Sequence, residues 1–145
     1  EYAIENILRS DYSKLEETAR YNLELKGKNF RAAILFLLAK SLYYNEHQTV
    51  PFESSEIYEK VTCLAASIEI AHNSSLLQDD IIDHSDSRLS EVAAHIVHGR
   101  SNAVFASNYM IARTSRMLTH VFSDSVHMSQ LFSTILYNLV FGELI

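Results

Sequence analysis

Glycine and proline are scarce in this chain of 145 residues, which contains 3 Gly and 1 Pro. Average usage of about 7% and 5% would give roughly 10 and 7. All-β sandwiches and barrels need turns rich in these residues at intervals of about 8 to 12 residues. The composition therefore argues against such folds and predicts long helices. Disorder is excluded as well, because a chain of this length with 48% hydrophobic residues can bury a core.

Basic residues and cysteine are also few. The chain has 12 Lys+Arg against 18 Asp+Glu and a net charge of -6, so it lacks the positive field that attracts nucleic acid. Its single cysteine, Cys63, cannot form an internal disulfide, which favours an intracellular, reducing compartment. The most apolar stretch, Leu131 to Ile145, is too short to span a bilayer. We therefore expect a soluble chain with no transmembrane segment and no targeting peptide.

Apolar periodicity predicts six or seven helices, no strands and one domain over residues 1–145, an all-α fold. The longest helix is capped by Ser54 or Ser55 and runs without a breaker to about Asp83. The segment from Phe30 to about Tyr44 is apolar around most of its circumference, as a fully buried helix is. Residues 84–90 are expected to form a polar connection. Further helices are predicted within 4–8 and over 10–25, 102–119 and 125–145.

Three aspartates lie near the end of the longest predicted helix, in Gln78-Asp79-Asp80-Ile81-Ile82-Asp83. In a helix, Asp79 and Asp83 share a face one turn apart, where like charges repel and the helix dipole adds to the cost. A divalent cation reverses both effects, and oxygen ligands suit Mg²⁺ shared with a phosphate. The alternative is an acidic helix end in solvent, because the motif is short.

Residues of the opposite charge lie upstream. Lys28 and Arg31 flank a break that contains Gly27, at the start of a helix, where backbone N–H groups and the dipole favour anions. The alternative is two solvated basic residues beside a loop. Together with Arg88, which follows Asp83 by five residues, the two clusters suggest chemistry on two diphosphates.

The sequence resembles the N-terminal half of the trans-isoprenyl diphosphate synthases, or polyprenyl synthetases, and is nearest to members that make long quinone side chains. The resemblance implies an isoprenoid-synthase-type helical bundle, incomplete in these 145 residues. It also implies Mg²⁺-dependent condensation of isopentenyl diphosphate with an allylic diphosphate. The segments that carry it are Gly27-Lys28-Asn29-Phe30-Arg31, Glu69-Ile70-Ala71-His72, Ser75 to Asp83, Ala94-His95-Ile96-Val97 with Gly99, Ala103-Val104, Ala112-Arg113 and Gly142-Glu143-Leu144-Ile145.

Carried over residue by residue, the resemblance implies that Asp79 and Asp83 hold Mg²⁺ against the allylic diphosphate, with Asp80 supporting them. Arg88 would contact the same diphosphate. The resemblance also implies an oligomer with another prenyl-synthase-like subunit, and a mitochondrial role in ubiquinone biosynthesis. The residues implied to bind isopentenyl diphosphate are Lys28, Arg31 and His72, and those implied to gate product length are Ala71, Ser74 and Ser75, whose small size favours a long product.

Departures from the family pattern leave a second interpretation open. Arg88-Leu89-Ser90-Glu91 stands where the family has R-R-G-K, and Ser107-Asn108 stands where it has Gly-Asp. The family's second Asp-rich motif does not occur in these residues, so this chain alone is not expected to catalyse the reaction. The alternative is a degenerate, non-catalytic homologue that serves as a structural or regulatory subunit of a larger assembly. A weaker third possibility is a lipid- or quinone-binding module.

Overall fold

The computed structural model of the chain describes residues 7–25, 29–46 and 50–142 and is mainly helical. Ile7 and Leu8 are helical and buried. The all-α prediction is confirmed, with six α-helices in these ranges. None of the helices in these ranges is both long and apolar enough to cross a membrane. The elements are α2 (Ser13–Glu24), α3 (Phe30–Glu46), the 3₁₀ helix η1 (Phe52–Ser54), α4 (Glu56–Ile82), β1 (Ser87–Arg88), β2 (Glu91–Val92), α5 (Ala94–Val97), α6 (Arg100–Val121) and α7 (Val126–Gly142).

The 27-residue helix α4 is the central element and contacts α2, α3, α5 and α6. It begins where predicted, because the Ser55 hydroxyl accepts a hydrogen bond of 3.2 Å from the Tyr58 N–H as an N-cap. It ends at Asp83 because His84 adopts a left-handed conformation (φ 55°), which turns the chain away. The carbonyl of Asp80 then accepts the Ser85 N–H at 3.0 Å, which satisfies one of the terminal carbonyls.

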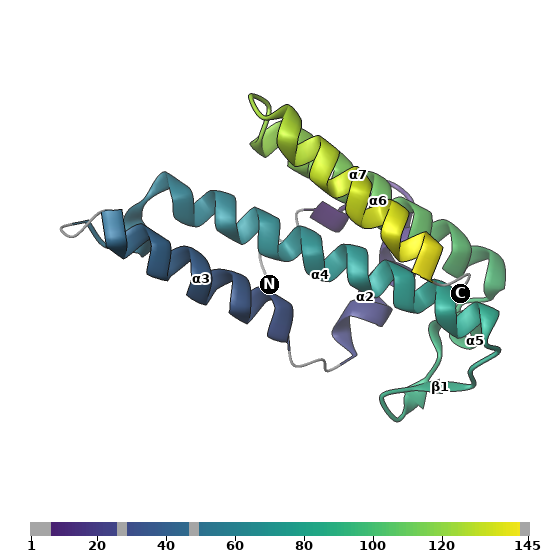
Figure 1. Cartoon of the computed structure of the whole chain (residues 1–145). Helices are drawn as coiled ribbons and strands as arrows, with labels where there is room; N and C mark the ends of the chain where they lie inside the picture. Colours follow the sequence, from purple (N-terminus) through teal and green to yellow (C-terminus); the bar gives the residue numbers. More distant parts are fainter. Residues whose placement is uncertain (1–6, 26–28, 47–49, 143–145) are drawn as a thin grey trace.

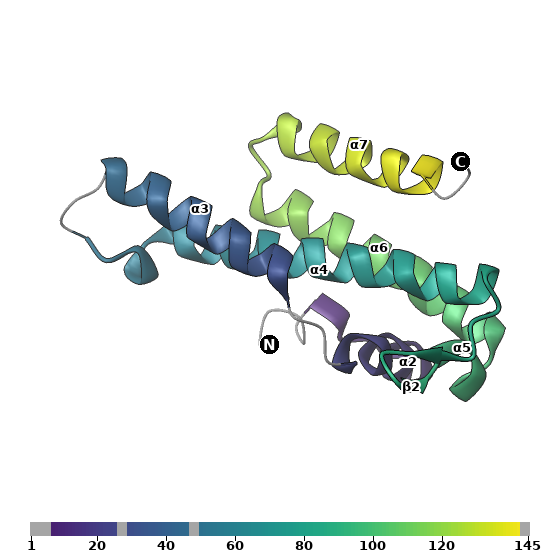
Figure 2. The same cartoon turned by 60° about the horizontal axis from the view of Figure 1, so that its bottom comes forward.

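The core lies mainly between α2, α4 and α6. Figure 2 shows α4 and α6 between α7 on one side and α2 on the other. Many core positions hold alanine, so side chains at these contacts are short and the helices can lie close together. A second cluster of Ala71, Leu118 and Phe132 joins α4, α6 and α7. The main cluster consists of Ile7, Leu8, Ala19, Ala66, Ile70, Leu77, Ala94, Ala103, Ala106 and Met110.

The helix α3 departs from the prediction that it is fully buried. Tyr43 is its one buried residue, whereas Phe30, Leu37 and Leu42 are 67%, 69% and 69% exposed. The pair formed by α3 and the first half of α4 extends beyond the other helices, so α3 packs mainly on α4 and η1 (Figure 1). The prediction was wrong because an apolar circumference shows that a helix has no polar face, but gives no information on what covers it.

A β-hairpin replaces the polar connection expected after α4. β1 and β2 pair antiparallel, with Arg88 opposite Glu91. The turn residues Leu89 and Ser90 both have positive φ, 50° and 71°, as in the type I′ turns that suit two-residue hairpins. The prediction of no strands was therefore wrong, because this turn is made without the Asn-Gly or Asp-Gly pair that usually indicates it.

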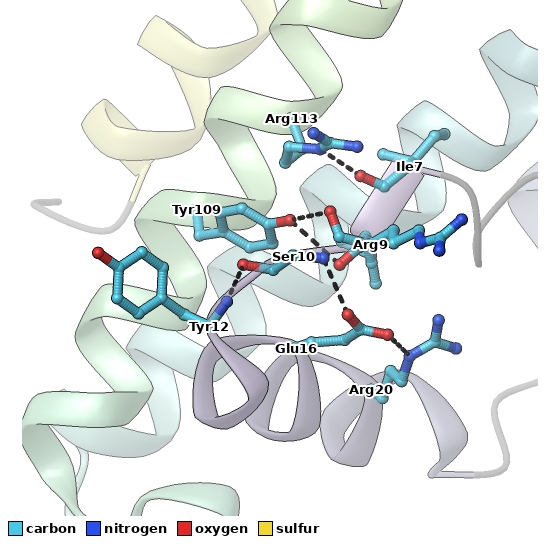
Figure 3. A network of polar contacts seen from close by, with 9 residues as sticks. Ile7, Arg9, Ser10, Tyr12, Glu16, Arg20, Tyr109 and Arg113 are labelled. Atoms are coloured by element: carbon cyan, nitrogen blue, oxygen red, sulfur yellow. Dashed lines mark hydrogen bonds and ion pairs between the residues drawn. The ribbon is translucent and has the colours of Figure 1, made fainter.

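Side chains of α6 hold the segment before α2 in place (Figure 3). The Tyr109 hydroxyl lies 3.1 Å from the Leu8 carbonyl and 2.8 Å from the Arg9 carbonyl, and it donates to them. The Nε–H group of Arg113 donates to the Ile7 carbonyl. These bonds satisfy carbonyls at the end of the helical turn around Ile7 and Leu8, which would otherwise lack partners.

Candidate functional site

The end of α4 presents two of the three aspartates on one side. Asp79 and Asp83 are one turn apart, and the Asp83 N–H donates to the Asp79 carbonyl at 2.8 Å, so helical geometry continues through both residues. Asp79 is half-buried and Asp83 is exposed. The two carboxylates therefore share a face, as the spacing predicts.

Asp80 forms an ion pair with Arg88 of the hairpin. Its Oδ1 atom accepts a hydrogen bond of 2.9 Å from Nη1 of Arg88, in an ion pair whose side chains are 6% (Asp80) and 22% (Arg88) exposed. The Oδ2 atom of Asp80 is buried and accepts no hydrogen bond from the described residues. A guanidinium carries five N–H donors, so the bond to Asp80 uses a fraction of the donors of Arg88. The hairpin thus fixes an arginine beside the aspartates, and its remaining donors could contact an anion.

The donor atoms at this helix end fit Mg²⁺ shared with a diphosphate. Within the part of the chain that the structure describes, no three His, Cys, Asp or Glu side chains form a ligand cage. Mg²⁺ does not require one, since it is usually bound through one or two carboxylates together with water and the phosphates of the substrate. Asp79 and Asp83 provide two carboxylates on one face, while Asp80 is held by Arg88.

Two arginines lie within electrostatic range of His72, which precedes Asp79 by seven residues on α4. Partial burial lowers the pKa of His72, the charges of Arg31 and Arg88 lower it further, and the carboxylate of Glu69 opposes them. Arg31, from the first turn of α3, and Arg88, from β1, therefore lie near the same imidazole. Two of the three predicted isopentenyl diphosphate ligands, Arg31 and His72, are thus brought together. The third, Lys28, lies outside the described residues.

A cavity of about 230 Å³ lies between α4, α6 and α7, and its lining on α4 extends to Gln78, the residue before Asp79. α6 runs antiparallel to both α4 and α7, as Figures 1 and 2 show. Along α4 the cavity therefore runs from Ala71, which belongs to the apolar cluster with Phe132, to the polar side chain of Gln78, while Asn108 lies at the level of Ser74. The lining residues are Ala71, Ser74, Ser75 and Gln78 from α4, Asn108 and Ile111 from α6, and Leu136, Leu139 and Val140 from α7.

All three predicted gate residues line this cavity, but Ser74 also has a structural bond. Ser74 is 1% exposed, and its hydroxyl lies 3.0 Å from the carbonyl and 3.1 Å from the hydroxyl of Ser107. Ser74 thus ties α4 to α6, while Ala71 and Ser75 contribute small side chains to the wall. The pair Ser107-Asn108, which departs from the family's Gly-Asp, enters the site as the partner of Ser74 and as a lining residue.

The sequence analysis missed the contribution of α7 to this cavity. Leu136, Leu139 and Val140 have the spacing of one helix face, so their common side could have been identified. Their partner helix could not, since it depends on how α7 folds back after Val121. The burial of Glu69 and its bond to the Ala32 N–H were also not predicted, because a carboxylate inside a long helix has no signal that distinguishes it from a solvated one.

Comparison with known proteins identifies the family and the fold. The family model described as "Polyprenyl synthetase" matches residues 12–145. Decaprenyl-diphosphate synthase subunit 1 of Schizosaccharomyces pombe is 27% identical over 97% of this chain, and a probable mitochondrial hexaprenyl pyrophosphate synthase of Yarrowia lipolytica is 34% identical over 65% of it. A polyprenyl synthase from Caulobacter crescentus, crystallised with calcium and isoprenyl diphosphate, has the same fold over 99% of this chain, with a TM-score of 0.80 and 22% identity.

The chain covers only part of these proteins. It spans 40% of the Schizosaccharomyces pombe protein, 20% of the Yarrowia lipolytica protein and 39% of the Caulobacter crescentus chain.

Proposed function

The chain belongs to the polyprenyl synthetase family, and we propose that it forms part of a synthase that condenses isopentenyl diphosphate with an allylic diphosphate in a Mg²⁺-dependent reaction. The position of the cavity carries the proposal. Its polar end lies at Gln78, adjacent in sequence to Asp79. An allylic diphosphate bound at the end of α4 would therefore direct its hydrocarbon tail between α4, α6 and α7.

Asp79 and Asp83 would hold the metal, and Arg88 would bind the same diphosphate. When bound, Mg²⁺ supplies positive charge that stabilises a departing diphosphate. Arg88 supplies further charge without moving far, because its bond to Asp80 already fixes it beside the aspartates. Asp80 would then act through Arg88.

Arg31 and His72 would bind isopentenyl diphosphate, together with Lys28. In the reaction that the family resemblance implies, the allylic carbon–oxygen bond breaks and diphosphate leaves. The resulting carbocation adds to the double bond of isopentenyl diphosphate, and loss of a proton from the adduct forms the new double bond. The apolar side chains of Ile111 and Leu136 would exclude the water that could otherwise capture the cation.

The cavity also bears on product length. An apolar cavity of about 150 Å³ holds a benzene molecule, so about 230 Å³ has room for roughly two five-carbon units. The small side chains of Ala71 and Ser75 leave the wall open, in keeping with a long product. Such a product would have to pass the cluster of Leu118 and Phe132 behind the cavity.

A non-catalytic, structural or regulatory homologue is the second candidate, favoured by one observation on the hairpin. Leu89, which stands in place of the family's second arginine, is 61% exposed at the turn, and exposed Glu91 lies opposite Arg88. An apolar and an acidic residue beside the diphosphate site would weaken anion binding, since a charge-assisted hydrogen bond contributes about 1.5 to 3 kcal/mol. This role would still require a partner.

Either function is expected in an oligomer with a prenyl-synthase-like subunit. We further propose a mitochondrial role in ubiquinone biosynthesis. Support for the compartment comes from the Yarrowia lipolytica relative, which is described as mitochondrial.

Calorimetric titration with inorganic pyrophosphate, with and without Mg²⁺, tests the site. Asp79→Ala and Asp83→Ala should each abolish the Mg²⁺-dependent part of binding. Asp86→Ala is the matched control, because it removes an exposed carboxylate three residues beyond Asp83 and should leave binding unchanged. Unchanged Mg²⁺-dependent binding in both site variants would show the metal assignment to be wrong.

Turnover separates the two candidates. The chain is incubated with labelled isopentenyl diphosphate, an allylic diphosphate and Mg²⁺, alone and with a prenyl-synthase-like partner subunit. Elongated product that depends on Asp79 supports the synthase. Mg²⁺-dependent diphosphate binding without product in either mixture supports the non-catalytic role.

A further inference from the structure

A buried carboxylate on α4 caps the start of another helix. Glu69 is 6% exposed, and its Oε1 atom accepts a hydrogen bond of 3.1 Å from the N–H of Ala32, in the first turn of α3. The first N–H groups of a helix have no partner within the helix and are usually satisfied by a neighbouring side chain in sequence. Here the acceptor comes from a residue 37 positions later. Glu69 therefore joins the first turn of α3, which contains Arg31, to α4.

The same turn of α4 holds the end of α2. The side-chain amide of Asn22, which is 1% exposed, donates to the Asn73 carbonyl at 2.9 Å. The Asn73 amide in turn donates to the Glu69 carbonyl at 2.8 Å. The two helices that flank residues 26–28 are thus bonded to one stretch of α4, 69–73. His72 lies within this stretch.

A negative charge at this place is costly for a diphosphate site. Glu69 lies close enough to His72 to influence its titration, so its carboxylate would repel a diphosphate bound at His72 and Arg31. Its hydrogen bond to Ala32 acts in the opposite direction, because it fixes the backbone next to Arg31 on α4 and so holds that arginine within electrostatic range of His72. The two effects can be separated, since one depends on the charge and the other on the reach of the side chain.

We propose that Glu69 is a positioning residue, which docks the first turn of α3 on α4 and so places Arg31 beside His72 for binding a diphosphate. The inference rests on the proposed function, whose anion site it deepens. Glu69 itself touches no substrate.

Two conservative variants test the proposal in the full chain. Glu69→Gln keeps an oxygen that can accept the Ala32 N–H but removes the charge, while Glu69→Asp keeps the charge but is one methylene too short. With inorganic pyrophosphate as the probe, we expect Glu69→Asp to weaken binding about tenfold, and Glu69→Gln to bind as tightly as the unaltered chain or up to about threefold more tightly. A role of the charge alone would leave Glu69→Asp binding as tightly as the unaltered chain, and that result would overturn the proposal.

The matched control is Glu53→Ala. Glu53 accepts a hydrogen bond of 2.6 Å from Lys40, so this variant also removes a carboxylate bonded to α3, but an exposed one away from the first turn of the helix. Pyrophosphate binding should be unchanged. If Glu53→Ala weakens binding as much as Glu69→Asp, the loss of any carboxylate bonded to α3 is sufficient for the effect, and the proposal is wrong.

A second measurement without ligand keeps the two hypotheses apart. The pKa of His72, followed by NMR, should fall in Glu69→Gln because the carboxylate that raises it is gone while Arg31 remains. In Glu69→Asp it should rise, because Arg31 is released while a carboxylate remains. Equal values in the two variants refute the positioning role. Failure of the unaltered chain to bind pyrophosphate would refute the proposed anion site, whereas the His72 titration would still decide whether Glu69 positions Arg31.

Discussion

Arg88→Ala removes the guanidinium that neutralises the buried carboxylate of Asp80. The Asp80 side chain is 6% exposed and its Oδ2 atom already lacks a hydrogen bond from the described residues, so the carboxylate would be left largely without compensation. Breaking a buried pair in this way costs about 3 kcal/mol. Asp80→Asn should cost less, about 1 kcal/mol, because Arg88 is 22% exposed and can turn to water.

The double variant isolates the interaction. Because no buried charge is left unpaired, the double variant Arg88→Ala with Asp80→Asn should lower the free energy of unfolding by about 2 kcal/mol. The two single changes together would lower it by about 4 kcal/mol, so the coupling energy is about 2 kcal/mol. The free energies are measured by urea unfolding, monitored by far-UV circular dichroism. In thermal unfolding, Arg88→Ala alone should lower the Tm by on the order of 10 °C. The exposed pair Lys40 and Glu53 is the control and should show no measurable coupling. A coupling below about 0.5 kcal/mol for Arg88 and Asp80 would refute the argument that this pair anchors the hairpin.

Three further predictions concern the hairpin turn at Ser90, the titration of His72 and the cavity beside Ser75. Ser90→Gly should raise the free energy of unfolding by about 1 kcal/mol in urea titrations, because Ser90 has a φ of 71°, which glycine adopts without strain; a loss of stability would contradict the turn geometry. Because the pKa of His72 is lowered in the folded chain, the unfolded chain binds more protons, so the urea midpoint should fall as pH drops through about 6.5 and below. His72→Gln should reduce this fall in the urea midpoint. An identical pH dependence in the variant and the unaltered chain would refute the assignment of the fall to His72. Ser75→Phe should fill the cavity and weaken binding of a long-tailed allylic diphosphate analogue by about tenfold more than that of a five-carbon analogue, at about 0.8 kcal/mol per CH₂ kept out; equal losses would show that the tail binds elsewhere.

The helices could be predicted where the signal is local. The cap at Ser55 and the unbroken run to Asp83 depend on neighbouring residues, and both agree with the structure. The hairpin could not, because its strands are two residues long and its turn uses Leu89 and Ser90 in place of glycine. The exposure of α3 was missed for a different reason. Its apolar residues face all directions, so the buried side depends on the position of α4 and not on the sequence of α3.

The candidate site shows the same division. The spacing of Asp79 and Asp83 determines their common face, which the sequence predicts and the helix provides. Asp80 pairs with Arg88, which lies in a different element, the hairpin. Ala32 donates to Glu69, which lies 37 positions later in the sequence. Such contacts depend on tertiary packing, so no local pattern predicts them.

The bonds from Tyr109 and Arg113 to the first described turn have a consequence for the order of folding. They join residues 100 to 106 positions apart, so the turn around Ile7 and Leu8 cannot dock until α6 has been made. At a synthesis rate of about 5 to 20 residues per second, that interval is roughly 5 to 20 seconds. Contacts of such long range form late and slow the folding of a domain. We expect Ile7 and Leu8, which are made about 100 residues before the α6 side chains that hold this turn, to be buried late and therefore to depend on chaperones during that interval.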